Sequence, residues 1–415
     1  MRQRLRKPVY HSALGPGLVT GAADDDPSGI ATYSQAGASY GYALLWPVVL
    51  AWPFLTAFQF TCAEIARVTG RGLAANLTAN LPRSAVWTVV LMLLGANIFN
   101  IASDIAAMAE AARLVTGLPR LPLMVGFALL SLGLQIFVPY HRYVGILKWL
   151  TLSLFAYVAV ILMVGVPWRS MLAGLVPSLP SGSATTVVAI LGTTISPYLF
   201  FWQSAQELEE MQLEHARPLN KSPAGAGREL HRLVMDSAGG FLVTMVISVC
   251  IISATAATLH GAGTNTIATA ADAAAALRPI AGDFAFMLFA VGIIGTGMLA
   301  VPVLAGSAAY ALAEVMGWRA GLEFKPAEAR GFYGIIFVAV ASALALDLFG
   351  IDAMQALFWT AVVNGLVAVP VMVAIMVLAS RRAVMGRFAV RGGQAWLGWG
   401  AAALMAAAAA GMFLA

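Results

Sequence analysis

Three consecutive aspartates, Asp24 to Asp26, lie inside an apolar stretch that is long enough to cross a membrane. One carboxylate at mid-membrane costs roughly 2.5–3.5 kcal/mol on insertion scales, so three together need water, a cation or shared protons. Pro27 follows at once and breaks a helix there, because it removes a backbone donor. A loop after a short first span is excluded by length, since only about a dozen residues lie between the basic N-terminus and the aspartates, and an apolar run from Ile30 to Trp46 follows them. Unwound backbone at this depth must line a cavity or be buried in protein.

A second proline interrupts another apolar stretch. Pro197 follows Ser196, and Thr193 and Thr194 add hydroxyl groups just before it. A lone proline in a membrane helix often causes only a kink. Here the two breaks fall in the first and sixth predicted spans, and interrupted segments at matching places in two halves point to a transporter's central site. Unwound carbonyls and the C-terminal ends of half-helices carry partial negative charge, which suits a cation.

Other polar side chains also fall inside predicted spans. Asn97, Asn100 and Asp104 are spaced i, i+3, i+7, so they share one helical face. This face either lines a water pathway or forms interhelical hydrogen bonds. Asn364 is a lone amide, for which helix–helix contact is the ordinary explanation. The run of Glu207, Glu209, Glu210 and Glu214 is expected to be a solvated helix face; the alternative is that it draws cations to an inner vestibule.

The composition of the chain indicates that its helices lie in a membrane. The chain has 415 residues, of which 60% are hydrophobic and 10% charged, with a mean hydropathy of +0.84. Soluble proteins are less apolar and about 25% charged. The chain is therefore predicted to be an all-α integral membrane protein, and a nucleic-acid-binding module is excluded despite a pI near 9.4. Cys62 and Cys250 both lie in apolar segments and are expected to be buried thiols.

Apolar runs predict eleven membrane spans. They cover residues 13–38, 43–68, 84–113, 121–140, 143–166, 185–210, 231–259, 283–314, 331–349, 351–380 and 393–414. With this count every Lys and Arg falls on one side of the membrane, except Arg113, Arg120, Arg169 and Arg278. The positive-inside rule then places the N-terminus in the cytoplasm and the C-terminus outside.

At these residues the sequence resembles a known family. The segment GPGLVTGAADDDPSGIATYSQAGASYGYALLWPVVLAW is similar to the first two spans of the NRAMP metal-ion transporters, which carry Asp-Pro-Gly-Asn in this frame. The resemblance implies a LeuT-like fold, with residues 13–166 and 185–380 as inverted five-helix repeats. Residues 1–12 would be a cytoplasmic anchor and residues 393–415 a peripheral eleventh helix. It also implies transport of divalent cations by the two broken helices, with no cofactor and no enzyme activity.

The resemblance assigns four metal-site positions. The family's metal-binding aspartate falls on Asp26, while its asparagine becomes Gly29. Ser196 replaces the family's methionine, and Thr193 replaces an alanine whose carbonyl helps to bind metal. Oxygen ligands suit Mg²⁺ and Mn²⁺, whereas a thioether selects softer metals. This combination is similar to the NRAMP-related magnesium transporter branch. Asp24 and Asp25 are expected to bind outer-shell water or to line the pathway.

Positions linked to protons also depart from the family. Tyr198 and Gln203 stand where it has histidines, and Ala107 stands where it has a glutamate, although Asp104 is kept. We therefore expect weak or absent proton coupling.

The sequence thus predicts a secondary transporter that imports Mg²⁺, and tolerates Mn²⁺, through a bacterial-type inner membrane. It contains no G-x-x-x-x-G-K-[ST] loop for ATP. The expected partners are the ion and the lipid bilayer, with no obligatory protein partner. Three alternatives stay open: a proton-coupled Mn²⁺ or Fe²⁺ importer, a sodium-coupled solute symporter on the same fold, and a membrane sensor that transports nothing.

Overall fold

The computed structural model describes residues 20–21, 23–138, 149–223, 225–263, 265–322, 324–347 and 352–414. Within these ranges the chain is helical and contains no strand. The predicted anchor at residues 1–12, the first residues of the first predicted span and residues 143–148 of the fifth lie outside the described ranges. The all-α fold class is confirmed for the part of the chain that is described.

Eight helical segments in the described ranges are long and apolar enough to cross a membrane. They are α3 (Trp46–Thr69), α5 (Arg83–Thr116), α6 (Arg120–Phe137), the pair α10 (Ala184–Thr194) and α11 (Pro197–Leu213), α12 (Ala226–Thr258), α15 (Ala285–Met316), α17 (Ala353–Ala379) and α19 (Gly392–Leu414). Shorter helices occupy the other predicted spans: α2 (Pro27–Tyr40), η2 (Leu150–Leu154) with α8 (Phe155–Met163), and α16 (Arg330–Asp347). The count of eleven spans stays a prediction.

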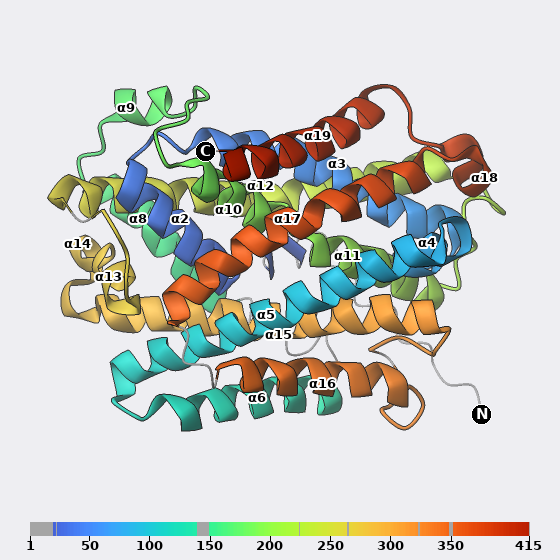
Figure 1. The fold of residues 1–415 in the computed structure, drawn as a ribbon, viewed down its shortest axis with the longest axis horizontal. Coiled ribbons are helices and arrows are strands. Elements are labelled where there is room, and N and C mark those ends of the chain that lie inside the picture. Colours follow the sequence, from blue (N-terminus) through green and yellow to red (C-terminus); the bar gives the residue numbers. More distant parts are fainter. Residues whose placement is uncertain are drawn as a thin grey trace.

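Within the described ranges, eight short helices lie between the long helices or directly at their ends. They are α4 (Leu73–Asn80), α9 (Trp168–Ala173), η3 (His260–Ala262), α13 (Ala270–Ala275), α14 (Arg278–Ala281), η4 (Gly282–Phe284), α18 (Arg382–Met385) and η5 (Gly386–Phe388). Figure 1 shows α9, α13 and α14 at one end of the molecule and α4 and α18 at the other. The long helices run between these two ends.

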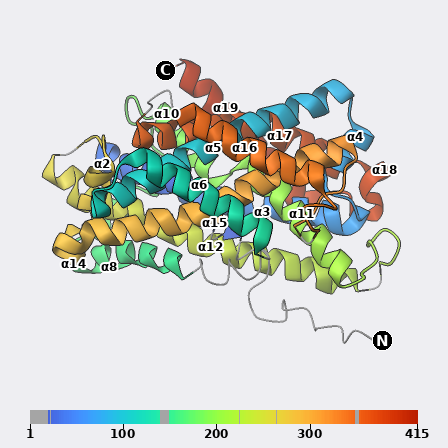
Figure 2. The same cartoon turned by 90° about the horizontal axis from the view of Figure 1, so that it is seen from below.

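Helix α5 runs through the molecule and packs along α15, α16, α17 and α6 (Figures 1 and 2). The first broken helix contacts α12, α10 and α17, and the second contacts α3 and α15. Glycines allow two of these approaches. A Cβ built at Gly37 would lie 2.0 Å from Oγ1 of Thr255 on α12, and one at Gly192 would lie 2.4 Å from the backbone nitrogen of Gly365 on α17. Small residues let membrane helices approach this closely.

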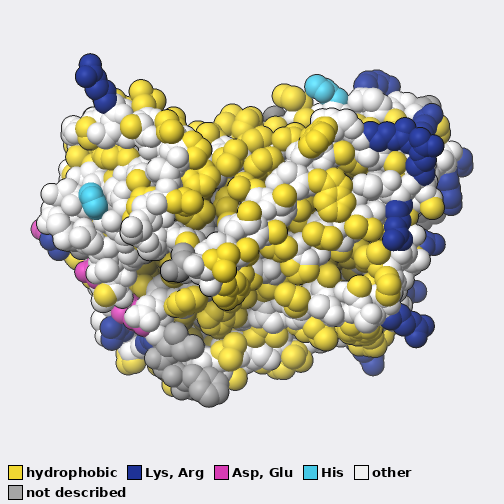
Figure 3. All heavy atoms as spheres, turned by 45° about the horizontal axis from the view of Figure 1, so that its top comes forward, with side chains coloured by type: hydrophobic (Ala, Val, Ile, Leu, Met, Phe, Trp, Pro, Cys, Tyr) yellow, Lys and Arg dark blue, Asp and Glu magenta, His cyan; other side chains and the backbone are white. Residues whose placement is uncertain are grey.

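The outer surface suits lipid. Helices α6, α8 and α19 expose large apolar side chains, among them Leu129, Phe137, Leu162 and Trp396. Figure 3 shows hydrophobic side chains over most of one face, with Lys and Arg gathered at the end where α4 and α18 lie in Figure 1. Both cysteines are buried and free, as predicted.

Candidate metal-ion site

The first broken helix is interrupted at Asp25 and Asp26. The residues just before them are helical, and α2 begins at Pro27. Asp26 has extended backbone (φ −71°, ψ 170°), as expected before proline. Proline fits the first helical position because the N–H it lacks has no partner there. The Oδ1 atom of Asp26 caps α2, accepting hydrogen bonds from the backbone nitrogen of Gly29 (2.8 Å) and Oγ of Ser28 (2.6 Å).

The second broken helix repeats this backbone design with different side-chain bonding. Ser196 is extended (φ −77°, ψ 124°), and Pro197 opens α11. The hydroxyl of Ser196 does not cap α11. It donates instead to the carbonyl oxygens of Thr193 (2.7 Å) and Gly192 (3.1 Å) in the last turn of α10. The hydrogen of this hydroxyl is thus engaged, whereas its oxygen lone pairs remain for an electrophile.

Four polar contacts join the two broken helices. Thr20 Oγ1 donates to Gln203 Oε1 (2.9 Å), and Tyr198 Oη donates to the carbonyl oxygen of Ala23 (3.3 Å). Two hydroxyl pairs complete the set: Ser28 Oγ with Thr193 Oγ1 (3.4 Å) and Tyr33 Oη with Thr194 Oγ1 (2.9 Å). The first half of each helix therefore lies beside the second half of the other. The two helices run antiparallel at the point where both are unwound.

This crossing brings the four predicted metal-site residues together. Ser28 bridges Asp26 to Thr193, and the carbonyl of Thr193 accepts the bond from Ser196. A Cβ at Gly29 would lie 3.2 Å from Oγ1 of Thr193, so the two breaks are in contact there. All of these side chains are buried. Sequence reasoning missed Ser28, whose place two residues after Asp26 is the signal that could have found it.

The polar face of α5 divides between two partners. Nδ2 of Asn100 donates to Oδ2 of Asp26 (3.3 Å), which places this amide at the site. Nδ2 of Asn97 donates instead to the carbonyl of Leu304 (2.9 Å) and to Oγ of Ser307 (2.8 Å), both on α15. Asn97 therefore forms an interhelical bond, which is one of the two alternatives left open by the sequence.

Several buried oxygens near the breaks have no hydrogen-bond partner among the described residues. They are both carboxylate oxygens of Asp24, Oδ1 of Asp25, both carboxylate oxygens of Asp104 and Oδ1 of Asn100. Both side-chain polar atoms of Asn364 on α17 are also unpartnered. Buried polar groups are costly unless they are satisfied by a partner, water or an ion. Within the described ranges no three His, Cys, Asp or Glu side chains group as a metal site.

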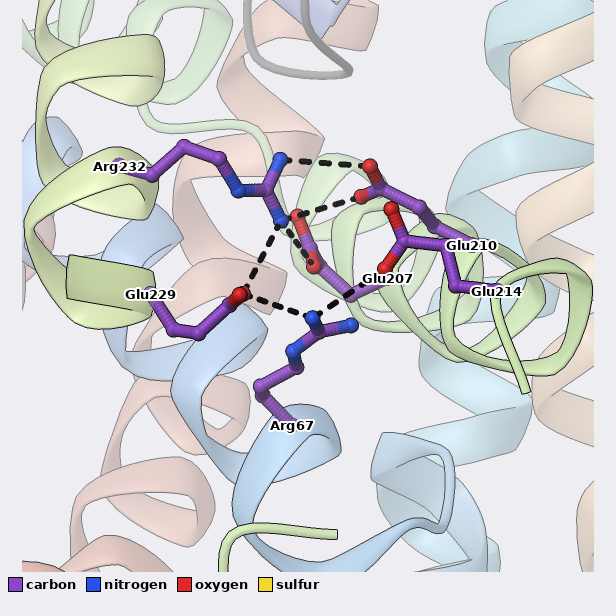
Figure 4. Close-up of polar contacts among 6 residues, drawn as sticks. All are labelled: Arg67, Glu207, Glu210, Glu214, Glu229 and Arg232. Atoms are coloured by element: carbon purple, nitrogen blue, oxygen red, sulfur yellow. Dashed lines mark hydrogen bonds and ion pairs between the residues drawn. The ribbon is translucent and has the colours of Figure 1, made fainter. Parts of the chain in front are cut away.

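The expectation that the glutamate run of α11 forms a solvated face is wrong for two of its four residues, whereas Glu214 is exposed. Glu207 and Glu210 are buried. Arg232 of α12 lies 3.6 Å from Glu207 and 3.2 Å from Glu210, and Arg67 of α3 lies 2.7 Å from Glu229 and 3.4 Å from Glu214 (Figure 4). These six residues, called here the charge cluster, connect α3, α11 and α12. Both arginines come from helices other than α11, so the run is paired across helices and not left entirely to solvent.

A cavity of about 260 Å³ lies beside the charge-bearing end of α11, between α4, α11 and α15. Its two carboxylates already have partners. Glu209 accepts hydrogen bonds from Tyr310 and from the backbone of Leu322, and Glu314 accepts one from the backbone of Ala75. We therefore place the candidate site at the helix breaks and not in this cavity.

Sequence comparisons agree with this architecture. The family model described as Natural resistance-associated macrophage protein-like (Nramp) matches residues 17–415. A protein named divalent metal cation transporter MntH from Acidiphilium cryptum is 31% identical over 393 residues, covering 91% of this chain and 84% of that protein. A protein of the same name from Burkholderia ambifaria is 27% identical over 388 residues, covering 91% and 83%.

Structural comparisons identify the fold. The manganese transporter of Eremococcus coleocola superposes with a TM-score of 0.76 at 18% identity, covering 97% of this chain and 87% of that chain. Mhp1, a nucleobase-cation-symport-1 family transporter, gives a TM-score of 0.60 at 13% identity, covering 96% and 93%. The expected LeuT-like fold is confirmed by these similarities.

Proposed function

Because this chain belongs to the Nramp family, we propose that it imports divalent metal ions by alternating access, with Mg²⁺ as the main ion and Mn²⁺ tolerated. Its relatives are named divalent metal cation transporters, and the chain spans more than four fifths of the two quoted above. The protein is a multi-pass membrane transporter. The choice of ion, the ligands and the coupling form the rest of the proposal.

One observation supports the proposal most directly: the crossing of the two breaks is built from oxygen donors. The carboxylate of Asp26, the carbonyl of Thr193 and the hydroxyl of Ser196 lie within one hydrogen-bonded chain. Such oxygen ligands suit Mg²⁺ and Mn²⁺. None of these three residues supplies a sulfur atom, which would favour softer metals. In this proposal Asp26 supplies the negative charge, Thr193 and Ser196 complete the ligand set, and Gly29 leaves space.

The buried oxygens around this crossing favour a partly hydrated ion. Magnesium gives up water reluctantly and usually keeps several water ligands when bound. Asp24, Asp25 and Asp104 have carboxylate oxygens that lack a donor among the described residues, so each can accept hydrogen bonds from such water. We assign them, with Asn364, to the outer shell or the pathway. Tyr198 and Gln203 hold the two helices together and belong to the same region.

The architecture supports transport by rocking of one helix bundle around a fixed site. The antiparallel contact of the two broken helices is expected if residues 13–166 and 185–380 are inverted repeats. Gathering of Lys and Arg at the α4 and α18 end favours that end as the cytoplasmic one, with the N-terminus inside an inner membrane. A negative interior then favours entry by about 2.3 kcal/mol per charge per 100 mV.

A second candidate is a proton-coupled importer of Mn²⁺ or Fe²⁺. It is favoured by the names of the relatives and by the fold match to a manganese transporter. The absence of methionine and histidine at positions 196, 198 and 203 counts against it. Similarity to Mhp1 concerns the fold, so a sodium-coupled solute symporter stays the weaker alternative.

Substitution of Asp26 tests the site. Asp26→Asn should reduce Mg²⁺ uptake into proteoliposomes to the level of protein-free vesicles, because an amide of similar volume lacks the charge that offsets loss of the ion's water. The matched control is Asp272→Asn, which removes a carboxylate that caps the short helix α13. It should leave uptake unchanged. Normal Mg²⁺ uptake by a well-folded Asp26→Asn protein would remove Asp26 from the site.

A further inference from the structure

The two oxygens of the Asp26 carboxylate have different surroundings. Oδ1 accepts two short hydrogen bonds from the first turn of α2 and is therefore committed to capping that helix. Oδ2 accepts a longer bond, 3.3 Å, from Nδ2 of Asn100 on α5. A cation that approaches Asp26 competes least with the cap when it binds Oδ2. It then meets the amide of Asn100 first.

The amide of Asn100 is half satisfied. Its nitrogen donates to Asp26, whereas its oxygen has no hydrogen-bond partner among the described residues, although the side chain is completely buried. A buried amide oxygen without a partner costs free energy. An amide presents a donor on one side and an acceptor on the other, and rotation about its last torsion exchanges them at little cost. The side chain can therefore offer either atom to the space beside Oδ2.

We propose that Asn100 is a ligand of the transported divalent ion, and that its amide turns to present Oδ1 when the ion binds Oδ2 of Asp26. This inference rests on the proposed function. Without the ion, the N–H of Asn100 occupies Oδ2. A cation repels that N–H and attracts the amide oxygen, so the turn exchanges one favourable pair for another. The side-chain amide of Asn100 on α5 then supplies a neutral oxygen, which Gly29 on α2 cannot supply because it has no side chain.

Gly29 and Asn100 reach the carboxylate from different sides. A Cβ at Gly29 would lie 3.6 Å from Oδ1 of Asp26, on the capping side, and 3.2 Å from Oγ1 of Thr193. Asn100 approaches Oδ2 instead. An amide on α5 therefore adds no side chain beside Thr193, while it still contributes an oxygen to the ion.

Two substitutions of Asn100 distinguish a ligand from a structural donor, because the two roles predict opposite orders. If Asn100 only donates to Asp26, Asn100→Asp should be worse than Asn100→Leu, since it sets two carboxylates against each other. If Asn100 is a ligand, Asn100→Asp should bind Mg²⁺ at least as tightly as the unaltered protein. Asn100→Leu should then weaken Mg²⁺ binding by about 10- to 100-fold, the range seen when partners around a metal are lost.

The matched control is Asn97→Leu, one turn away on the same helix. Asn97 is equally buried, also has an unpartnered Oδ1, and bonds α15 instead of Asp26. It should lower thermal stability without changing the Mg²⁺ dissociation constant. Binding of Mg²⁺ and of Mn²⁺ to the purified full-length protein is measured by titration calorimetry, with melting curves as the check on folding.

The outcomes separate this inference from the proposed function. Normal uptake in Asp26→Asn would overturn both. An essential Asp26 with unchanged Mg²⁺ binding in Asn100→Leu, or weaker binding in Asn100→Asp than in Asn100→Leu, would overturn the role of Asn100 alone. If the leucine variant does not fold, Asn100→Asp decides by itself: binding as tight as in the unaltered protein supports the ligand, and weaker binding overturns it.

Discussion

At the scale of single residues, the hydroxyl of Ser196 combines two tasks. Its hydrogen bonds to Thr193 and Gly192 satisfy carbonyls at the end of α10, which the break leaves without helical partners. Its oxygen is at the same time a hard donor at the crossing. Methionine at this position would supply a soft sulfur and would leave both carbonyls without this hydrogen bond. In the proposed ligand set, ion preference and the hydrogen bonding of the break therefore depend on the same side chain.

Rebuilding the ordinary family ligands should change ion preference. The double variant Ser196→Met with Gly29→Asn should bind Cd²⁺ more tightly relative to Mg²⁺ by about tenfold or more, equivalent to about 1.4 kcal/mol, because sulfur favours softer ions. The new side chain at position 29 must displace Thr193 by a few tenths of an ångström. Competition between Mg²⁺ and Cd²⁺ for the purified protein measures the ratio.

Gly29→Asn alone is the control. It adds a side chain beside Thr193 but no sulfur, so it separates the effect of crowding at the site from the effect of a sulfur ligand. An unchanged Mg²⁺ to Cd²⁺ ratio in the double variant would mean that position 196 does not contact the ion, and would contradict the ligand set proposed here.

The sequence indicated Asp26, Thr193 and Ser196 at the two breaks, but not the other hydroxyl groups that link them. Ser28, Tyr33 and Thr194 join the two breaks, although serine, tyrosine and threonine are common in membrane helices for many reasons. Helical spacing placed Asn97 and Asn100 on one face. It could not show that only Asn100 reaches Asp26, because the neighbouring helix, and not the spacing, determines the partner.

At the scale of helices, the charge cluster fastens α11 to α3 and α12 (Figure 4). It holds four carboxylates and two guanidinium groups, so the arginines offset half of the formal negative charge. The side chain of Arg67 is only 4% exposed, whereas that of Glu229 is 36% exposed. Arg67 is therefore the more buried of the two arginines, because the side chain of Arg232 is 38% exposed.

Removal of Arg67 should destabilise the protein. Arg67→Met keeps much of the side-chain volume but leaves Glu214 and Glu229 without their shared partner. Breaking a buried pair costs about 3–5 kcal/mol, and the half-exposed Glu229 points to the lower end of that range. A fall in the melting temperature of the detergent-purified protein measures this effect.

Arg113→Met is the matched control, because Arg113 is half exposed and pairs with Glu110 on its own helix. Exposed pairs contribute about 0–1 kcal/mol, so this variant should melt close to the unaltered protein. Equal melting temperatures for the two variants would show that the charge cluster does not stabilise the fold.

Predicting helices from hydropathy succeeded for the long spans and failed for what lies between them. Helices such as α4 and α9 are too short to give a hydropathy signal, and α4 depends on Glu314 of α15 to cap its start. The burial of Glu207 and Glu210 on α11 was missed because, like the cap of α4, it depends on residues of other helices. The partners of the glutamate run lie on other helices, 147 residues away in the case of Arg67 and Glu214, so no local pattern reveals them.

At the scale of the whole molecule, the fold class followed from composition and the resemblance, because a chain this apolar has few ways to satisfy its backbone. The candidate site lies where the two broken helices cross. The groups that contact each other there, Thr20 with Gln203 and Ala23 with Tyr198, are about 180 residues apart in the sequence. Any rearrangement that separates the two broken helices must therefore break these contacts.

Uptake of Mg²⁺ should occur with little or no proton movement. At the crossing, glutamine has no titratable proton, a tyrosine phenol stays protonated near neutral pH, and Ala107 offers no carrier on α5. Tyr198 and Gln203 are also engaged in contacts with the first broken helix. The measurement uses a pH-sensitive dye inside proteoliposomes, with Mg²⁺ or Mn²⁺ added outside and protein-free vesicles as the control. Ion uptake without internal acidification is the expected result.

The carboxylates that remain define how this prediction can fail. Asp24 and Asp104 are buried, and neither carboxylate has a hydrogen-bond partner in the described part of the chain, so either of them could hold a proton. Acidification that rises with the metal dose and disappears in Asp26→Asn would show that protons accompany the ion. Asp24→Asn and Asp104→Asn would then locate the carrier, because the variant that abolishes acidification while keeping metal uptake has lost the proton's binding group. Loss of acidification in Asp24→Asn would identify a proton route through the three-aspartate run, since Tyr198 and Gln203 do not provide a proton carrier near neutral pH.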